Sequence, residues 1–434
     1  MAEVTTLSGE RFSPELPSRL LTIAGDIREA GGRAFLVGGW VRDALLGKNC
    51  RDYDIEVYDL NQEELIPILK KYGRTNLVGK AFGVIHLAMK GESLDFSFPR
   101  TESKIGYGHR GFVVHTDAKL TFKEAALRRD FTINAMGMEL PDLKLCDPYG
   151  GIEDLKAKRL RHVGPAFAED SLRVLRGVQF ASRFGLTLAP ETVELCRTLS
   201  LEDLSIERLF EEFKKWLLKP GVPSLGLRAF CDIGLDGFFP EIKPLENSWE
   251  KLGLLLDGVS AYAKRENLSD EDKMVLMFST LLAGNVTDGV CDEAAVLKFL
   301  SRITNEVKLV RNVPRLLKHG FIYTPSKPAK SDAEIRRLSV ALDGLRLMLA
   351  FAENNPCYEE SLQKEFVSGL KARAEQLSVL DCAPQAYLTG KLLMELGVRP
   401  GKQMGELIKQ SFELQLDGIL KSEADAVTWA KSQF

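Results

Sequence analysis

A change of pattern near residue 165 constrains the fold more than any other feature of the sequence. Before it, short apolar or alternating runs typical of strands lie between helical segments. After it, apolar residues recur every three or four positions, as they do in amphipathic helices. A chain of 434 residues is too long for one compact core and predicts two to four domains. We therefore expect an α/β head followed by a long, mostly helical region.

The head is expected to alternate helices with strands, because its apolar residues switch between the two spacings. The patterns predict helices over 13–31, 61–73 and 122–139, and strands over 34–39, 52–60, 82–89 and 93–99. Beyond the head, segments 169–185 and 207–218 show helical spacing most clearly. The sequence contains no internal repeat and no low-complexity tract, so a repeat array is excluded.

Charge, cysteines and hydropathy narrow the class of protein. The net charge of −3 gives no sign of nucleic-acid binding; the stretch 156–183 carries seven Lys or Arg against two acids, which a solvated helix face would also explain. No run approaches 18 apolar residues and no secretory signal is recognisable, so we expect no membrane span. The five histidines form no cluster and the seven cysteines no CxxC pair, which argues against zinc and predicts a cytoplasmic protein with reduced thiols.

Three acids alternate with other residues in the run RDYDIEVYDL, which spans 51–60. Residues i and i+2 of a strand point to the same face, so Asp52 and Asp54 would place two carboxylates side by side. Such like charges repel unless a cation bridges them, and hard oxygen ligands suit Mg²⁺. The wet outer face of an edge strand would also carry acids, so the run alone leaves both interpretations open.

The segment just upstream, FLVGGWVRDALLG at 35–47, predicts a strand, a tight glycine turn and a helix. Glycines let backbone amides approach a phosphate, and Arg42 in the first helical turn could reach the same anion. The structural alternative is an ordinary turn in which Arg42 pairs with Asp43. Downstream, Asp95 lies on a second predicted strand, where it could complete a carboxylate triad or simply be a surface acid.

A glycine turn, a helix and acids on adjacent strands form the arrangement of polymerase-β-like nucleotidyltransferases, in which two metals clamp a nucleoside triphosphate. Further motifs follow in order: LRRDFTINAMG (127–137), DPYGGIEDL (147–155), AFAEDSLRVLRGVQFASRFG (166–185) and, near the end, LTGKLLMELGVRPGKQMGELIKQSFELQLDGIL (388–420). Together with GGWVRDALLG and RDYDIE, this series resembles the class II, bacterial-type tRNA nucleotidyltransferase and poly(A) polymerase family. Its last segment is most similar to the tail of CCA-adding members.

The resemblance implies an α/β polymerase-β-like nucleotidyltransferase head followed by an all-α neck, body and tail. The predicted boundaries are 1–150 for the head, 151–235 for the neck with its nucleobase-selecting motif, 236–375 for the body and 376–434 for a tRNA-binding tail. The resemblance also implies that Asp52 and Asp54 are Mg²⁺ ligands and that Asp95 is the third catalytic carboxylate.

Nucleotide-binding roles are implied as well. Phosphate contacts would come from Gly39 and Arg42, while Arg128, Arg129, Asp130 and Asn134 lie in the motif that holds triphosphate and ribose. Glu169, Asp170 and Arg173 match the EDxxR motif that acts as a protein template for the base, and Arg176 would add a further contact.

The template can also be argued from the residues. Asp170 and Arg173 are three positions apart, hence on one face of a predicted helix. An acceptor beside a donor suits a base edge with an amino group next to a ring nitrogen, as cytosine and adenine have and uracil and guanine lack. A mismatched edge leaves buried polar groups unpaired, at about 1–3 kcal/mol each. The structural alternative is an intrahelical salt bridge worth about 0.5 kcal/mol.

Three departures from the family pattern stand out. Gln179 occupies a position where an arginine is common, one turn beyond Arg176. The segment 276–285 lacks the HD metal signature of some members, so no phosphohydrolase activity is expected. Pro99 precedes Arg100 and alters how that arginine would be presented.

The leading expectation is an enzyme that adds CCA to the 3′ end of tRNA from CTP and ATP. The glycine-rich segment 101–120 resembles the flexible loop needed for the switch to A, and Gly397 and Gly405 flank a predicted helix start that could hold an RNA phosphate, or be ordinary caps. The alternatives are an A-adding or CC-adding relative, a poly(A) polymerase, although the chain lacks that enzyme's basic tail, or an inactive RNA-binding protein. No stable protein partner is expected.

Overall fold

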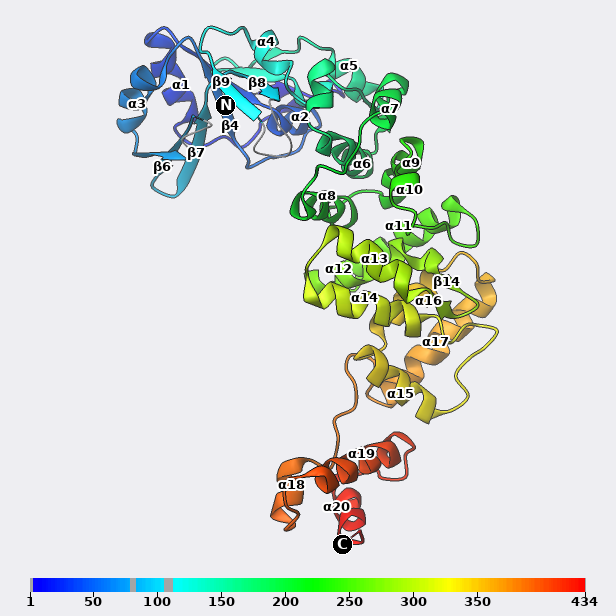
Figure 1. Ribbon diagram of the computed structural model, residues 1–434. Helices are drawn as coiled ribbons and strands as arrows, with labels where there is room; N and C mark the ends of the chain where they lie inside the picture. Colours follow the sequence, from blue (N-terminus) through cyan, green and yellow to red (C-terminus); the bar gives the residue numbers. More distant parts are fainter. Residues whose placement is uncertain (1–2, 79–82, 105–111, 434) are drawn as a thin grey trace. The chain divides into compact units, whose positions relative to one another are not determined.

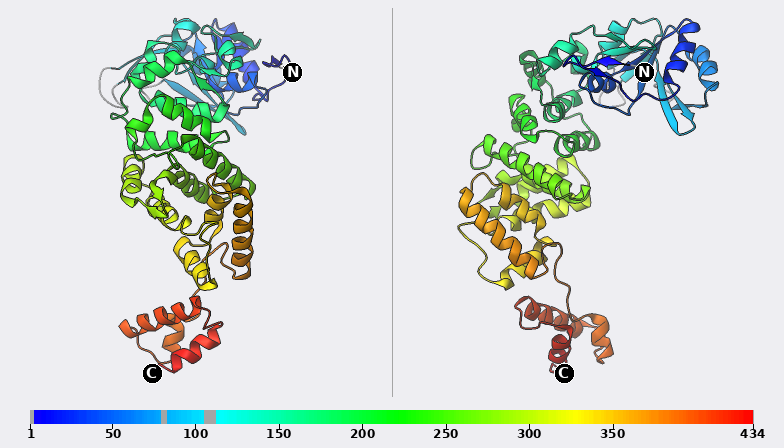
Figure 2. Two further views of the ribbon diagram at one scale, coloured as in Figure 1. Left: turned by 90° about the vertical axis from the view of Figure 1, so that its right-hand side faces the viewer. Right: turned by 180° about the vertical axis from the view of Figure 1, so that it is seen from behind.

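The computed structural model describes residues 3–78, 83–104 and 112–433. The chain divides into two compact units: Met1–Trp216 with Ala229–Gly234, and Leu217–Arg228 with Leu235–Phe434. Figure 1 and the two views of Figure 2 show the larger strands gathered in the first unit, drawn in blue and cyan, and mostly helices in the second. The predicted α/β head followed by a mostly helical region is confirmed. The fourfold division into head, neck, body and tail stays a prediction.

The first unit is built on a seven-stranded mixed sheet in the order β11-β10-β3-β4-β7-β6-β5. Its strands are β3 (Arg33–Val37), β4 (Asp54–Tyr58), β5 (Arg74–Val78), β6 (Val84–Met89), β7 (Glu92–Ser97), β10 (Gly137–Leu140) and β11 (Lys144–Cys146). Strands β4 and β7 are parallel, and the other neighbouring pairs are antiparallel. The register of the parallel pair sets Asp54 opposite Asp95, which brings two predicted acids together.

The core of this unit explains why β3 is almost wholly apolar. Its residues from Ala34 onward are buried, since the strand is paired on both sides and covered by helices. Helices α1 (Leu20–Glu29) and α3 (Gln62–Lys70) pack on the sheet and on each other. Helix α4 (Phe122–Ala126) contributes Phe122, whose ring stacks on Phe35 with centroids 5.0 Å apart.

The predicted helix over 122–139 is wrong beyond its first turn. A capping box between Thr121 and Glu124 starts α4, but the helix ends at Ala126 and is followed by a 3-10 turn, η2 (Thr132–Asn134), and by β10. Strand β10 pairs with both β3 and β11, and a Cβ on Gly137 would lie 2.4 Å from the Phe122 ring. Pairing in the sheet therefore overrides the helical spacing read from the sequence.

Other boundaries differ by a few residues. The helix expected from residue 13 begins at Leu20, and the strand expected from residue 52 begins at Asp54, so Asp52 lies just before it. The segment 101–120 contains a hairpin of β8 (Arg100–Lys104) and β9 (Phe112–Thr116), and residues 105–111 of the predicted flexible loop lie outside the described residues. A short pair, β1 (Val4–Thr5) with β2 (Arg11–Phe12), had no sequence signal.

Further helices belong to the first unit, and some of them contribute residues to a cavity described below. They are α2 (Gly39–Leu45), α5 (Gly151–Lys156), η3 (Pro165–Glu169), α6 (Leu172–Phe184) and α7 (Pro190–Arg197), followed by α8 (Ile206–Leu218). Strands β12 (Arg159–Leu160) and β13 (Thr187–Leu188) form a small parallel pair between them.

The second unit is helical apart from the short pair β14 (Val286–Thr287) and β15 (Val290–Cys291). Its helices are α10 (Leu235–Phe238), α11 (Trp249–Arg265), α12 (Asp270–Leu281), α13 (Glu293–Ile303), α14 (Val307–Gly320), α15 (Asp332–Leu342), α16 (Arg346–Asn354), α17 (Glu360–Gln376), α18 (Gly390–Glu395), α19 (Lys402–Leu416) and α20 (Glu423–Lys431). Helix α9 (Pro223–Asp232) has residues in both units. Within the described ranges, no helix combines the length and apolarity needed to span a membrane.

Candidate active site

A cavity of about 580 Å³ opens in the first unit, where the β3–α2 turn, the start of β4, the segment after α4, and helices α6 and α8 meet. Ten of the eleven predicted site residues line it: Gly39, Arg42, Asp52, Asp54, Arg129, Asp130, Asn134, Asp170, Arg173 and Arg176. Eight arginines and lysines face five aspartates, so the cavity carries an excess of positive charge suited to a polyanion. Segments far apart in the sequence therefore converge on one place.

The acidic end of the cavity is formed by Asp52 and Asp54. Burial raises the pKa of Asp54, and the negative charge of Asp52 raises it further, with a smaller contribution from Asp95. Asp95 itself lies outside the cavity lining and pairs with His86 of strand β6, Oδ1 to Nδ1 at 2.6 Å. The catalytic role predicted for Asp95 stays a prediction.

The donor set of this end suits a divalent cation. The negative charge of Asp52 disfavours ionisation of Asp54, and a bound positive charge would relieve that repulsion. Throughout the described part of the chain, no group of three or more His, Cys, Asp and Glu side chains is placed to hold a metal. Mg²⁺ commonly uses one or two carboxylates together with waters and substrate phosphates. The pair Asp52 and Asp54 therefore fits a metal that binds together with a nucleotide.

The glycine turn brings backbone against two arginines. Gly38 has φ 69°, in the left-handed region that favours glycine, and a Cβ there would lie 3.2 Å from Nη1 of Arg129. Arg42 is 4% exposed and donates from Nε to Asp43 at 2.9 Å and from Nη1 to Asn134 Oδ1 at 2.6 Å. Burial lowers the pKa of Arg42, and the charge of Asp43 opposes that shift. The pairing with Asp43 that was the structural alternative is thus present, alongside a contact to a predicted nucleotide-binding residue.

The segment after α4 forms a second polar cluster. The Asp130 carboxylate accepts from the backbone N–H of Phe131 at 2.7 Å and from Asn134 Nδ2 at 3.0 Å. Arg176 on α6 pairs with its other oxygen at 2.6 Å. Although burial opposes ionisation, the charge of Arg176 and these hydrogen bonds hold the pKa of Asp130 below its ordinary value. The cluster joins two sequence motifs that lie 46 residues apart.

Glu56 anchors the arginines of this segment and was not assigned a role from the sequence. Its carboxylate is 1% exposed, accepts from Arg128 Nη2 at 3.0 Å and lies 3.9 Å from Arg129 Nη2. The Tyr58 hydroxyl donates to it at 2.6 Å. The signal was present, since Glu56 is the third acid of the alternating run and shares a strand face with Asp54. Arg129 keeps a buried Nε for which the described residues provide no hydrogen-bond partner.

The predicted base template is assembled differently from expectation. Asp170 precedes the helix with extended backbone, φ −127° and ψ 100°, and α6 begins at Leu172, so Asp170 and Arg173 do not share a helix face. The Asp170 carboxylate accepts from the Leu172 N–H at 3.2 Å and from Arg208 of α8 at 2.8 Å. Arg173 donates to the carbonyls of Ala166 at 2.6 Å and Arg128 at 2.7 Å.

Both template side chains nevertheless line the same cavity. Glu169, the third member of that motif, ends η3 and is absent from the lining.

Besides the residues already described, the cavity lining includes Gln179 and Arg183 on α6, and Arg208 and Lys215 on α8, to which the sequence assigned no binding role. Gln179 is 2% exposed and its Oε1 has no hydrogen-bond partner among the described residues. A buried amide oxygen without a partner at a cavity wall is costly unless a ligand supplies a donor. On α8, Arg208 and Lys215 lie seven positions apart, which places them on one helix face.

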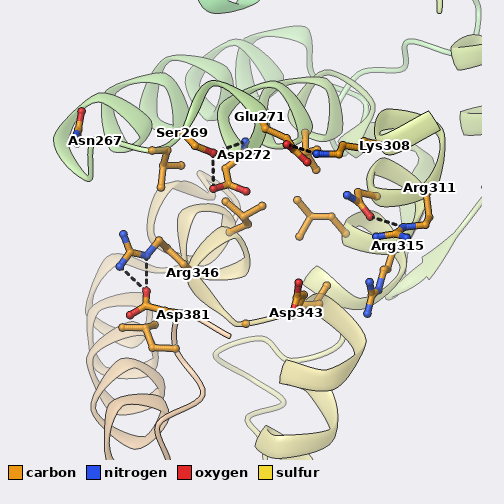
Figure 3. Close-up of a pocket in the computed structure, with 18 residues that line it drawn as sticks. Asn267, Ser269, Glu271, Asp272, Lys308, Arg311, Arg315, Asp343, Arg346 and Asp381 are labelled. Carbon is orange, nitrogen blue, oxygen red and sulfur yellow. Dashed lines mark hydrogen bonds and ion pairs between the residues drawn. The ribbon is translucent and has the colours of Figure 1, made fainter. Parts of the chain in front are cut away.

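A second cavity, of about 590 Å³, lies in the second unit among α12, α14 and the ends of α15 and α16 (Figure 3). Lys308 pairs with Glu271 at 2.6 Å, and Arg346 donates to Asp381 at 2.8 Å. Arg315 donates to the carbonyls of Val340 and Ala341 at the end of α15. Its four cations face four acids, so the charges of this cavity largely satisfy one another.

Comparisons with known proteins bear on the first unit most strongly. A family model described as the poly(A) polymerase head domain matches residues 34–161, and one described as the probable RNA- and SrmB-binding site of polymerase A matches 185–246. The multifunctional CCA protein of Xanthomonas campestris is 42% identical over 221 residues, 49% of this chain and 52% of that protein. The chain therefore carries a poly(A) polymerase head domain and resembles the class II family of CCA-adding enzymes and poly(A) polymerases. The resemblance expected from the motifs is confirmed.

Solved structures extend the likeness in fold to nearly the whole length. The Thermotoga maritima CCA-adding enzyme complexed with tRNA superposes with TM-score 0.65 and 21% identity, covering 96% of each chain. A tRNA-processing enzyme in apo form I superposes with TM-score 0.62 and 26% identity, covering 91% of this chain and 98% of that one. In sequence, the match spans about half the length of the curated relatives. Members of this class II family typically use a divalent metal.

Proposed function

We propose that this protein is a template-independent tRNA nucleotidyltransferase that builds the 3′ CCA end of tRNA from CTP and ATP. The observation that carries the proposal is the convergence of the acidic pair, the glycine turn, the buried arginines and the Asp170–Arg173 pair on a single cavity. The similarity to a multifunctional CCA protein and to a tRNA-processing enzyme supports it. We propose a cytoplasmic location, where tRNA maturation would require it.

Asp52 and Asp54 would hold Mg²⁺, and Asp95 would act beside them. The ion would supply charge neutralisation at the attacking hydroxyl and the departing pyrophosphate. Around this end, the Gly39 backbone, Arg42 and Arg129 would orient the triphosphate by hydrogen bonds and charge, while Asp130 and Asn134 would hold the ribose. Because these groups are already buried and bonded to one another, they would not need to reorganise when the nucleotide binds.

Base choice would rest on Asp170 and Arg173, with Arg176 steadying the neighbouring cluster. A carboxylate only accepts hydrogen bonds and a guanidinium only donates them. An amino group can donate to Asp170 while the adjacent ring nitrogen accepts from Arg173, as in cytosine and adenine. Uracil and guanine present a carbonyl to the carboxylate instead, which leaves two acceptors facing each other.

The alternatives are an A-adding or CC-adding enzyme, or a poly(A) polymerase. The observation that favours these alternatives is Gln179. Its buried amide lies in the cavity at a position where related chains commonly have an arginine. An inactive RNA-binding protein is disfavoured, since such a protein would have no need for the acidic pair at the cavity.

The test is end extension of a tRNA transcript lacking its CCA, with Mg²⁺, CTP and ATP, resolved at single nucleotides. Three additions followed by a stop are expected. Two C residues only, one A only on a transcript already ending in CC, or a long A tail would each replace the proposal with a specific relative. No addition with any nucleotide would overturn the enzyme assignment.

A further inference from the structure

Helix α8 reaches the base-reading end of the cavity with an arginine that belongs to none of the motifs. We propose that Arg208 is a positioning residue for nucleobase selection: it holds the Asp170 carboxylate in the orientation that accepts an amino group. This inference rests on the proposed function, because it takes Asp170 as the reader of the base. It predicts that a residue 38 positions away from Asp170 governs which nucleotide is added.

The contact geometry fixes the carboxylate from two sides. One oxygen of Asp170 accepts from the backbone N–H of Leu172 at 3.2 Å, and the other accepts from Nη2 of Arg208 at 2.8 Å. Both side chains are partly shielded, with 24% of Arg208 and 21% of Asp170 exposed. Since both oxygens have a donor, the plane of the carboxylate is set before any nucleotide binds, and its remaining lone pairs are directed accordingly.

The helix that carries Arg208 is firmly held within the same unit. Its apolar face is buried, including Phe213 and Trp216 at 1% exposure, and Trp216 stacks on Phe230 with centroids 5.7 Å apart. The buried Ser182 hydroxyl of α6 donates to the Trp216 carbonyl at 3.4 Å, which ties α8 to the helix that follows Asp170. Arg208 is therefore offered from a packed scaffold and not from a mobile surface segment.

Substitution of Arg208 should change the preference between nucleotides more than the rate of nucleotide addition. Among the residues that the structure describes, no hydrogen bond or ion pair joins Arg208 to the acidic pair, the glycine turn or the Asp130–Arg176 pair, so phosphate binding should persist. A carboxylate released from one side can rotate away from a carbonyl oxygen, which removes part of the penalty against uracil and guanine. Arg173 is held separately by two backbone carbonyls and would keep its place.

The experiment compares Arg208→Ala, Arg208→Gln and Arg208→Lys with wild type in the full chain. It measures kcat/KM for CTP and UTP on a transcript lacking CCA, and for ATP and GTP on one ending in CC. We expect the preference for CTP over UTP to fall about tenfold or more in Arg208→Ala. Arg208→Gln, which keeps a neutral donor, should fall between, and Arg208→Lys should retain more of the preference than Gln.

The matched control is Lys214→Met on the same helix, which breaks a partly exposed pair with Glu211 outside the cavity. It should leave both ratios unchanged. If wild type selects CTP and ATP but all Arg208 variants keep the wild-type ratio, the role of Arg208 is overturned while the proposed function stands. If wild type adds no nucleotide at all, the proposed function fails first. A uniform loss for all four nucleotides with an unchanged ratio would mean that Arg208 is structural only.

Discussion

Two cavities of nearly equal volume, one in each unit, differ in how their charges are paired. In the cavity of the second unit, the lining has equal numbers of acidic and basic residues, and ion pairs form between them. In the cavity of the first unit, basic residues outnumber acidic ones. There, Arg129 and Gln179 each have a buried polar atom for which the described residues provide no hydrogen-bond partner. The volume of a cavity and the number of charged residues in it therefore do not by themselves identify a binding site. Charges without a partner and buried polar atoms without a hydrogen bond are the better indication. Five predictions test that comparison.

The largest effect is expected from the acidic pair. Replacing both Asp52 and Asp54 with Ala should reduce the rate of nucleotide addition by at least about a thousandfold, because these two carboxylates would hold the metal that neutralises the developing charge. Steady-state rates with saturating CTP provide the measurement. As a matched control, Asp381→Asn in the second cavity should keep its rate near wild type. Activity that survives the double substitution would remove the two carboxylates from the mechanism.

The buried Glu56 network should carry most of the structural cost of the charged site. Glu56→Gln leaves Arg128 and Arg129 without their counter-charge, so we expect a loss of about 3 kcal/mol in the free energy of unfolding. Denaturant titration at neutral pH measures it, with Glu139→Gln as the control, since its pair with Arg33 is more exposed. Equal losses in the two variants would contradict the assignment.

The same network predicts a pH dependence. Burial opposes ionisation of Glu56, but Arg129 and then Arg128 outweigh it, so the pKa of Glu56 lies below its ordinary value of 4.5. A depressed carboxyl pKa contributes stability that is present above pH 4.5 and is lost as the pH falls through the folded-state pKa. The difference in unfolding free energy between wild type and Glu56→Gln should therefore shrink on acidification below 4.5. A constant or growing difference would show that the carboxylate is not held ionised.

A smaller and opposite effect is expected at Gln179. Gln179→Met keeps the shape of the side chain and removes an amide oxygen that lacks a partner, so the unfolding free energy should rise by about 1 kcal/mol. If the nucleotide supplies the missing donor, kcat/KM for CTP should fall at the same time. Thermal unfolding and initial rates give the two readouts. A variant that is neither more stable nor slower would mean that the amide is satisfied in another way.

The smallest effect belongs to the second cavity. Arg311 is exposed and donates from Nε to the neighbouring Asn312 at 3.2 Å. Arg311→Ala should change the KM for CTP by no more than about twofold, because a solvated charge in another unit is screened from the nucleotide. A larger change would break the distinction drawn between the two cavities.

The sequence predicted which residues lie together better than it predicted the helices, strands and partners that hold them. Ten of eleven converge as expected because the motifs are dense local clusters of unusual residues, readable without the fold. Arg208 and Lys215 escaped notice because, on an amphipathic helix, a charged residue facing a cavity has the same spacing as one facing water. Asp95 was placed beside Asp54 correctly, but its pairing with His86 depends on a third strand that the pattern could not align.

The helix boundaries predicted near the site are wrong because tertiary contacts determine the structure there. The helical spacing of 122–139 is real in the sequence, yet Gly137 and its neighbours pair with β3 and β11, and the arginines before them reach Glu56. Asp170 likewise lies before the start of the helix, where its carboxylate pairs with Arg208. Local propensity is a weak preference that buried ion pairs and sheet hydrogen bonds outweigh. Both corrections fall where the site is assembled, where local rules are most often broken.

The most direct test of the central claim is a crystal structure of the full chain with CTP and Mg²⁺. We expect density for the nucleotide in the first-unit cavity, with the cytosine edge at Asp170 and Arg173 and the triphosphate toward Asp52 and Asp54, and none in the second cavity. Nucleotide bound in the second cavity, or in the first with its base away from Asp170 and Arg173, would contradict the account.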